Sequence, residues 1–246
     1  MRKFVYCLGA VLLLLTAEAR ASSAGQLPFF SAYPRLDRAH WRVSDGWANG
    51  DWQSCEWRAD ALSATHGNLR LRLSDKGGKL RHYGCAEIHS AALTRYGRYE
   101  ARLRAAEGSG LNTAFFVYVG PPVGVPSHDE IDFEFLGRDT HAVEVTYWRH
   151  GKKLDHTVVP LGYDAAAAFH DYAFAWSPSA IHWYVDGRLV HETTTGAPMP
   201  DNAMRIYLSL WSGAAAENAW MGPFIYKKPA TADIAWVSYA PHGNKP

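Results

Sequence analysis

Apolar and polar side chains alternate with a period of two along much of this chain, a pattern typical of β-strands that are buried on one face. The clearest runs lie at 69–73, 98–104, 143–148, 181–185 and 204–211. In each run the apolar residues take every second position, and mostly polar or aromatic residues lie between them. Many half-buried strands of this kind predict an antiparallel β-sandwich or barrel.

Turn signals separate these runs. Asp186-Gly187 directly follows the run at 181–185, and this dipeptide has the turn chemistry of a tight β-hairpin. Only the segment at 164–172, with the sequence DAAAAFHDY, is expected to form a short helical turn. Because no repeat, low-complexity tract or linker divides the chain, we expect a single domain over residues 22–246.

The first 21 residues are expected to be a signal peptide. A basic pair precedes an apolar run over residues 4–15, and the sequence Ala-Arg-Ala at 19–21 has the small-x-small pattern that a signal peptidase cleaves. The apolar run is too short to span a bilayer comfortably. We therefore expect a secreted or periplasmic protein with no membrane partner.

Charge and cysteine content narrow the choice of function. Cleavage after Ala21 would leave 22 Lys and Arg against 23 Asp and Glu, and a net charge of −1 argues against a nucleic-acid or acidic-lipid partner. Cys55 and Cys85 would remain, and an even pair in an exported chain is most simply a disulfide. The alternative, a metal site, has little support because neither HExxH nor CxxC spacing occurs.

One predicted strand carries a row of acids. The segment HDEIDFEFLG, residues 128–137, places Glu130, Asp132 and Glu134 at intervals of two, with apolar residues between them. Like charges on one strand face repel each other, and Asp and Glu are poor strand formers. A solvated polar face is one interpretation. The unbroken run of acids and the aromatic residues nearby favour a functional site instead.

Aromatic side chains are expected on the same side of the sheet as the acids. They are Phe116, Tyr118, Trp148, Tyr207 and Trp211. Aromatic rings beside acids suit a sugar chain, whose C–H faces stack on rings while its hydroxyl groups need polar partners. Cleavage of a glycosidic bond needs two carboxyl groups, for which Glu130 and Glu134 are the candidates. Curvature of the sheet would bring these groups to the roughly 5–5.5 Å typical of a retaining enzyme, and the charge of Asp132 would raise a neighbour's pKa.

The motif EIDFE resembles the catalytic signature of glycoside hydrolase family 16. Further segments fall in the order seen in the bacterial licheninase branch: NGDWQSCEWRAD, CAEIHS, YGRYEARL, TAFFVYVGPPVG, FHDYAFAWSP, IHWYVDGRLVHET and LSLWSG. The resemblance implies a concanavalin-like β-jelly roll, a sandwich of two antiparallel sheets with a concave substrate cleft. It also implies a retaining endo-β-glucanase with Glu130 as nucleophile, Asp132 as assisting acid and Glu134 as acid/base, and a Cys55–Cys85 disulfide.

A set of substrate-binding residues completes the expected cleft. They are Trp47, Asn49, Glu87, His89, Phe116, Tyr118, His128, Trp148, Ser209 and Trp211. Four positions depart from the licheninase pattern: His128 replaces a Trp, His89 an Arg, and Thr146 and Ser209 two Asn residues. With these departures the chain looks more like relatives that trim bacterial exopolysaccharides, the succinoglycan-depolymerase type.

The expected activity is hydrolysis of internal β-1,4 bonds in mixed β-1,3-1,4-glucan or in an exopolysaccharide such as succinoglycan. The alternatives are an endotransglycosylase acting on β-glucan or xyloglucan, and a non-catalytic lectin on the same fold. No cofactor is expected to be required, and the polysaccharide is the expected partner of a monomeric protein. A structural calcium ion is common in such enzymes. In this chain Ala235 occupies the position where an Asp usually binds the calcium ion, and Asp233 lies two residues earlier. The sequence therefore leaves open whether the protein binds calcium.

Overall fold

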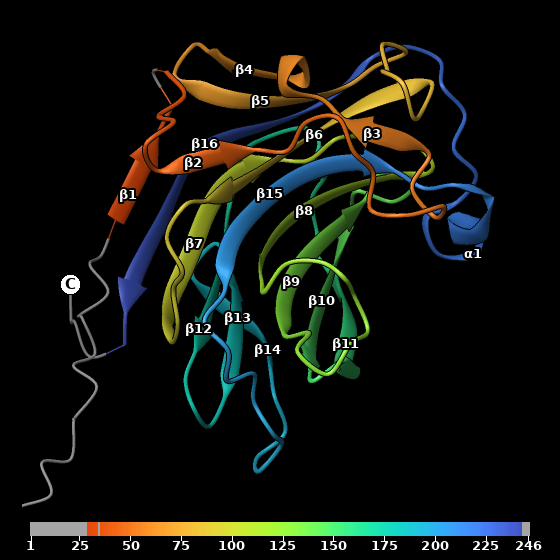
Figure 1. Ribbon diagram of the computed structural model, residues 1–246. Helices are drawn as coiled ribbons and strands as arrows, with labels where there is room; N and C mark the ends of the chain where they lie inside the picture. The colour runs from red at the N-terminus through yellow and green to blue at the C-terminus, as the bar shows by residue number, and fades with distance from the viewer. Residues whose placement is uncertain (1–28, 34, 243–246) are drawn as a thin grey trace, which may run out of the picture.

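The computed structural model describes residues 29–33 and 35–242, so the expected signal peptide lies outside the described residues. Two antiparallel sheets make up almost all of the regular secondary structure of the described residues (Figure 1). Helix in the described ranges is limited to short 3-10 turns at Ala59–Ala61 and Ala215–Glu217 and to α1, Asn218–Met221. None of these helices has the length and hydrophobicity needed to cross a membrane.

The first sheet, here called the outer sheet, has the strand order β14-β13-β12-β7-β16-β5-β4, and β1 pairs with β16. Its strands are β1 (Phe29–Ala32), β4 (Leu62–Thr65), β5 (Asn68–Leu73), β7 (Gly97–Arg104), β12 (His170–Trp176), β13 (Ile181–Val185), β14 (Arg188–Glu192) and β16 (Ala230–Pro241).

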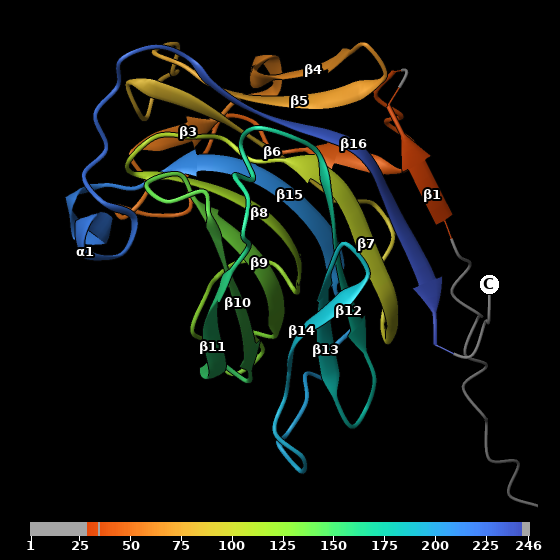
Figure 2. The same cartoon turned by 180° about the vertical axis from the view of Figure 1, so that it is seen from behind.

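The second sheet, here called the inner sheet, has the order β11-β10-β9-β8-β15-β6-β2, and β3 pairs with β6 in parallel. Its strands are β2 (Trp41–Val43), β3 (Cys55–Trp57), β6 (Tyr83–Ser90), β8 (Leu111–Tyr118), β9 (Glu130–Leu136), β10 (Ala142–Arg149), β11 (Lys152–Pro160) and β15 (Arg205–Ser212). Strands β15 and β8 bend strongly, and β16 and β7 pass around their outside in both views (Figures 1 and 2).

The hydrophobic core lies between the two sheets and fixes which way the acidic strand faces. On β9, the rings of Phe133 and Phe135 lie 5.7 and 4.6 Å from Tyr172 of the outer sheet, and on β8 Phe115 lies 5.6 Å from Phe174. All five side chains are fully buried. Because successive side chains of a strand point to opposite faces, the acids between these phenylalanines face away from the core.

Two local predictions have different outcomes. Asp186 and Gly187 both have positive φ, 47° and 75°, so they form the predicted hairpin turn between β13 and β14. The helical turn expected at 164–172 is wrong, because only a turn at 165–167 forms and β12 begins at His170. The Asp164 carboxylate accepts the Ala166 amide, which favours a turn over a helix, and pairing with β7 draws the following residues into a strand.

The predicted disulfide between Cys55 and Cys85 is confirmed. It joins β3 to β6, and both cysteines are fully buried. The bridge therefore holds the segment that follows β2 against the inner sheet.

Candidate active site

The face of the inner sheet that is turned away from the outer sheet, here called the open face, collects residues from five strands in rows. Strand register places Trp148, Glu130, Tyr118 and Arg205 in the first row; Thr146, Asp132, Phe116, Tyr207 and His89 in the second; and Glu144, Glu134, Ala114, Ser209 and Glu87 in the third. Directly opposite residues on antiparallel strands have neighbouring side chains. Pairing of the strands therefore assembles acids and aromatic rings on one surface.

Glu130 is half-buried, and its carboxylate has a defined partner. Its side chain is 18% exposed, and one carboxylate oxygen, Oε2, lies 2.6 Å from His128 Nε2. The hydrogen bond restrains the carboxylate while the residue remains open to a ligand. This combination suits a group that reacts directly with a bound molecule.

Asp132 occupies the middle of the acidic row and is buried. Burial raises the pKa of Asp132 well above its usual range, and the negative charges of Glu130 and Glu134 raise it further. Its Oδ1 has no hydrogen-bond partner among the described residues, and the same holds for Oγ1 of Thr146 opposite it. The surroundings of Asp132 therefore favour a neutral, protonated carboxyl group.

Glu134 is half-buried and accepts a hydrogen bond from Asn112 Nδ2 to Oε1 at 2.9 Å. Burial raises the pKa of Glu134 to about 8, against the lowering effect of the Asn112 hydrogen bond. The charges of Glu130 and Glu144 add to the increase. A carboxyl group with this pKa carries a proton at neutral pH, as a general acid requires.

Asp129, the first acid of the same run, serves the fold. It is fully buried, and its carboxylate oxygens accept the backbone amides of His150, Asp201 and Asn202. Possible ligand atoms of Asp129, His150 and Asp201 lie within 4.8 Å of one another. The amide donors already satisfy the Asp129 carboxylate, so its role is to tie two loops to the start of β9.

Aromatic rings cover the open face beside the acids. Phe116 stacks on Tyr207 with ring centroids 5.0 Å apart, Tyr118 lies 5.8 Å from Tyr207, and His89 lies 5.1 Å from it. Trp148 stands opposite Glu130 in the first row. The predicted aromatic set therefore does share one face with the acidic row.

Glu87 and His89 bring polar groups to β6 on the same face. Ser44 Oγ donates to Glu87 Oε1 at 2.6 Å. Burial raises the pKa of Glu87 to about 7, opposed by the Ser44 hydrogen bond and reinforced by the charge of Glu130. Burial also lowers the pKa of His89, which favours a neutral ring at pH 7.

The remaining predicted residues occupy the border of this face. Trp211 lies at the end of β15, 5.1 Å from Trp52. Trp47 packs edge-on against Trp57, and Asn49 Oδ1 accepts from Trp57 Nε1 at 3.2 Å. These contacts hold the loop after β2 on β3, and substrate binding by Trp47 and Asn49 stays a prediction.

His128 has a different setting from the one expected. It was predicted to bind substrate, yet only 1% of the residue is exposed and it contacts Glu130 instead of solvent. The ring lies against Trp148 and Tyr118. Both ring nitrogens already have protein partners, the Gly124 amide and the Glu130 carboxylate, so the ring has no free polar atom for a direct sugar contact.

Sequence reasoning missed several residues of the site. The Asn112 side chain donates a hydrogen bond to Glu134. On β10, the next strand, the Glu144 carboxylate accepts hydrogen bonds from the side chains of His156 on β11 and Trp220 on α1. A signal for Asn112 was present, since counting back by twos from Phe116 along β8 reaches it. No local pattern indicated His156, because its contact depends on the pairing of β10 with β11.

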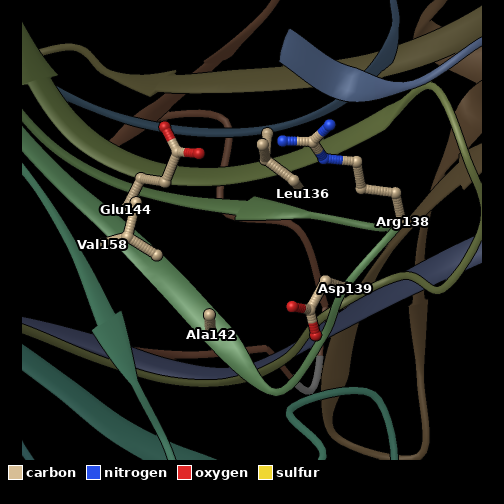
Figure 3. Close-up of a pocket in the computed structure, with 6 residues that line it drawn as sticks. All are labelled: Leu136, Arg138, Asp139, Ala142, Glu144 and Val158. Carbon is tan, nitrogen blue, oxygen red and sulfur yellow. The ribbon is translucent and has the colours of Figure 1, made fainter. Parts of the chain in front are cut away.

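A hollow of about 240 Å³ adjoins the third row of the open face (Figure 3). Its lining residues are Leu136, Arg138, Asp139, Ala142, Glu144 and Val158. Glu144 pairs directly with Glu134 across the strands, so the hollow begins beside the acid with the raised pKa.

The surroundings of Asp233 do not fit a calcium ion. Its carboxylate accepts hydrogen bonds from Arg70 Nε and Nη2 at 2.7 and 3.1 Å and from Arg104 Nη2 at 2.6 Å. Burial opposes ionisation of Asp233, but these hydrogen bonds outweigh it and lower its pKa. Two guanidinium groups already neutralise the carboxylate, and they would repel a metal cation.

Comparisons with known proteins agree with this geometry. A model of glycosyl hydrolases family 16 matches residues 49–237. The endo-1,3-1,4-beta-glycanase ExoK of Rhizobium meliloti (strain 1021) is 41% identical over 217 residues, which cover 88% of this chain and 80% of that protein. The beta-glucanase of Bacillus subtilis (strain 168) is 38% identical over 229 residues, covering 93% of this chain and 91% of that protein.

A solved structure shows the same architecture. The prokaryotic beta-1,3-1,4-glucanase (lichenase) derived from a mouse hindgut metagenome matches with a TM-score of 0.81 at 34% identity, covering 87% of this chain and 99% of that one. The predicted jelly-roll sandwich and the glycoside hydrolase class are thereby confirmed. With a family match over most of its length and close relatives over nearly all of it, the chain belongs to glycosyl hydrolases family 16.

Proposed function

We propose that this chain hydrolyses internal β-1,4 bonds of mixed β-1,3-1,4-glucan, or of an exopolysaccharide with similar linkages such as succinoglycan, with retention of configuration. The observation that carries this proposal is the acidic row of β9, where burial raises the pKa of Glu134 to about 8 on the same strand face as Glu130, whose side chain is 18% exposed. The names of the relatives, an endo-1,3-1,4-beta-glycanase and a beta-glucanase, support the substrate class.

In the first step, Glu130 attacks the anomeric carbon while Glu134 gives its proton to the departing glycosidic oxygen. The bond from carbon to the leaving oxygen breaks and an ester to Glu130 forms. Glu134 is suited to this step because burial and nearby charge keep it protonated near pH 7. The buried, protonated Asp132 between them limits the negative charge of the row.

In the second step, Glu134 acts as a base and removes a proton from water, which attacks the anomeric carbon and releases Glu130. The structure suggests why one residue serves both steps. The negative charge of Glu130 is one cause of the raised pKa of Glu134, and the ester removes that charge. The pKa of Glu134 therefore falls after the first step, so it becomes a better base when one is needed.

The aromatic and polar residues of the open face are proposed to hold the sugar chain. Phe116, Tyr118, Trp148 and Trp211 offer ring faces and edges, while Glu87 and Ser209 supply polar groups in the third row. Such sites fix orientation with few polar contacts among apolar ones. We further propose that the protein is exported and acts as a monomer, because an open face on a single chain is enough to bind a polymer.

The direct test assigns the roles of the two glutamates by chemical rescue. Glu130→Ala and Glu134→Ala variants are incubated with azide and an aryl β-glycoside of a mixed-linkage oligosaccharide. With Glu130→Ala, azide takes the place of the nucleophile and the product is the α-glycosyl azide. With Glu134→Ala, azide opens the ester instead and the product is the β-glycosyl azide. Exchange of the two products would reverse the assignment, and no rescue of either variant would refute it.

Substrate choice is tested on the native protein. Release of reducing ends is measured in parallel on mixed-linkage glucan, β-1,3-glucan, xyloglucan and succinoglycan, with Glu130→Gln as the blank. Activity on mixed-linkage glucan or succinoglycan supports the proposal. Products longer than the supplied chains would identify a transglycosylase, and binding without any release would identify a lectin.

A further inference from the structure

His128 is held in one orientation by hydrogen bonds on both ring nitrogens. The Gly124 amide donates to Nδ1 at 2.9 Å, and Nε2 lies 2.6 Å from Glu130 Oε2. A backbone amide can only donate, so Nδ1 must be the unprotonated nitrogen that accepts. The neutral ring then carries its proton on Nε2, which donates to the Glu130 carboxylate.

Packing prevents this ring from turning. Trp148 stacks on it at 5.0 Å and Tyr118 meets it edge-on at 5.2 Å. The backbone is also fixed, because the His128 amide donates to Val125 O and its carbonyl accepts from the Gly151 amide. A buried side chain with this many restraints has few alternative rotamers.

The contact reaches a group that changes charge during the proposed reaction. Glu130 gives up its negative charge when the ester forms and regains it when the ester breaks. A donor already in place on Oε2 strengthens its hydrogen bond as charge returns to the departing carboxylate. Because this hydrogen bond already holds the Glu130 side chain in place, the reaction does not lose entropy in orienting it.

We propose that His128 is a positioning residue for the nucleophile, with the Gly124 amide selecting the tautomer that donates to Glu130. This inference rests on the proposed role of Glu130. It assigns to His128 a function in the reaction step and none in sugar recognition.

The test compares His128→Phe, which keeps a buried ring but has no donor, with His128→Gln, which keeps an N–H donor. Initial rates are measured with an aryl β-glycoside of a mixed-linkage oligosaccharide. We expect His128→Phe to lower kcat by about 10- to 100-fold, the range for losing a hydrogen bond to a charged group, with KM changed less than about twofold. His128→Gln should recover at least part of that loss. His182→Phe, on β13 of the outer sheet, controls for the replacement itself.

Several results would overturn this inference. A kcat within twofold of native in His128→Phe, or a raised KM with unchanged kcat, would exclude positioning of the nucleophile. A second measurement needs no variant to fold. Nitrogen-15 NMR of the native protein labelled in histidine should show a His128 ring protonated on Nε2 alone, and a proton on Nδ1 would contradict the proposal. Formation of α-glycosyl azide by Glu130→Ala, measured in parallel, separates failure of this inference from failure of the proposed function.

Discussion

Removal of the Asn112 side chain tests the electrostatic argument for Glu134 most directly. Asn112 Nδ2 donates to Glu134 Oε1 at 2.9 Å, and this hydrogen bond stabilises the ionised form of Glu134. A hydrogen bond to a charged group contributes roughly 1.5–3 kcal/mol, and one pKa unit corresponds to about 1.4 kcal/mol. The Asn112→Ala variant should therefore raise the pKa of Glu134 from about 8 by at least about one unit.

The consequence appears in the pH dependence of kcat/KM, whose alkaline limb reports the essential acid of the free enzyme. With a pKa of about 8, only about a tenth of Glu134 is protonated at pH 9. A one-unit increase would leave about half of it protonated. Activity at pH 9, relative to each protein's own plateau, should therefore rise about fivefold in the variant. The plateau itself should fall, because a weaker acid transfers its proton less readily.

The assay follows initial rates on soluble mixed-linkage glucan from pH 5 to 10. Asn68→Ala serves as the matched control, because Asn68 lies on β5 of the outer sheet. Dividing each rate by the same protein's plateau rate removes from the comparison any loss of activity that comes from poorer positioning of Glu134. An alkaline limb that stays where it is in the native enzyme, or that moves to lower pH, would show that Asn112 does not control the ionisation of the general acid.

Three further predictions concern stability. Replacing Cys55 with Ser should lower stability by roughly 3–4 kcal/mol on the chain-entropy model, a fall in Tm of about 10 °C by calorimetry, and an unchanged Tm would contradict this. Glu134→Gln should raise stability by up to about 3 kcal/mol at pH 7. Because the pKa of Glu134 is raised in the folded state, the native protein loses stability as pH rises from about 4.5 towards 8, whereas the Gln variant does not. The extra stability of the variant, measured by denaturant unfolding, should therefore vanish below pH 4. Asp233→Asn should lower stability by about 2 kcal/mol. This is less than the loss expected on breaking a fully buried ion pair, because the side chains of Arg70 and Arg104 are more than a third exposed. The lowered pKa of Asp233 stabilises the protein above about pH 4, so this difference should disappear as pH falls through the folded-state pKa, and a difference that persists in acid would refute the ion pair as its cause.

Much of the fold follows from local pattern. Alternation along β9 places Phe133 in the core and Glu134 on the opposite face, because a strand has a period of two whatever it pairs with. Turn chemistry at Asp186 likewise depends on backbone preferences of adjacent residues, and it was predicted correctly. The helical turn expected at 164–172 was wrong because contacts outside the segment decide its shape: Ala165 hydrogen-bonds to Thr140 and Ala105, and β7 pairs with the residues from His170 onward.

The chemistry of the site depends on contacts between distant parts of the chain. The partner of Glu134 is Asn112 on β8, and the partner of Glu87 is Ser44, which lies 43 residues earlier in the chain. Periodicity assigns each residue to a face, but it does not say which strand lies alongside or at which register. Desolvation raises the pKa values of Asp132 and Glu134, and it exists only after the neighbouring strands have paired and their side chains have enclosed these two carboxyl groups. The sequence therefore determined which acids share a surface, while the tertiary structure decided which of them holds a proton.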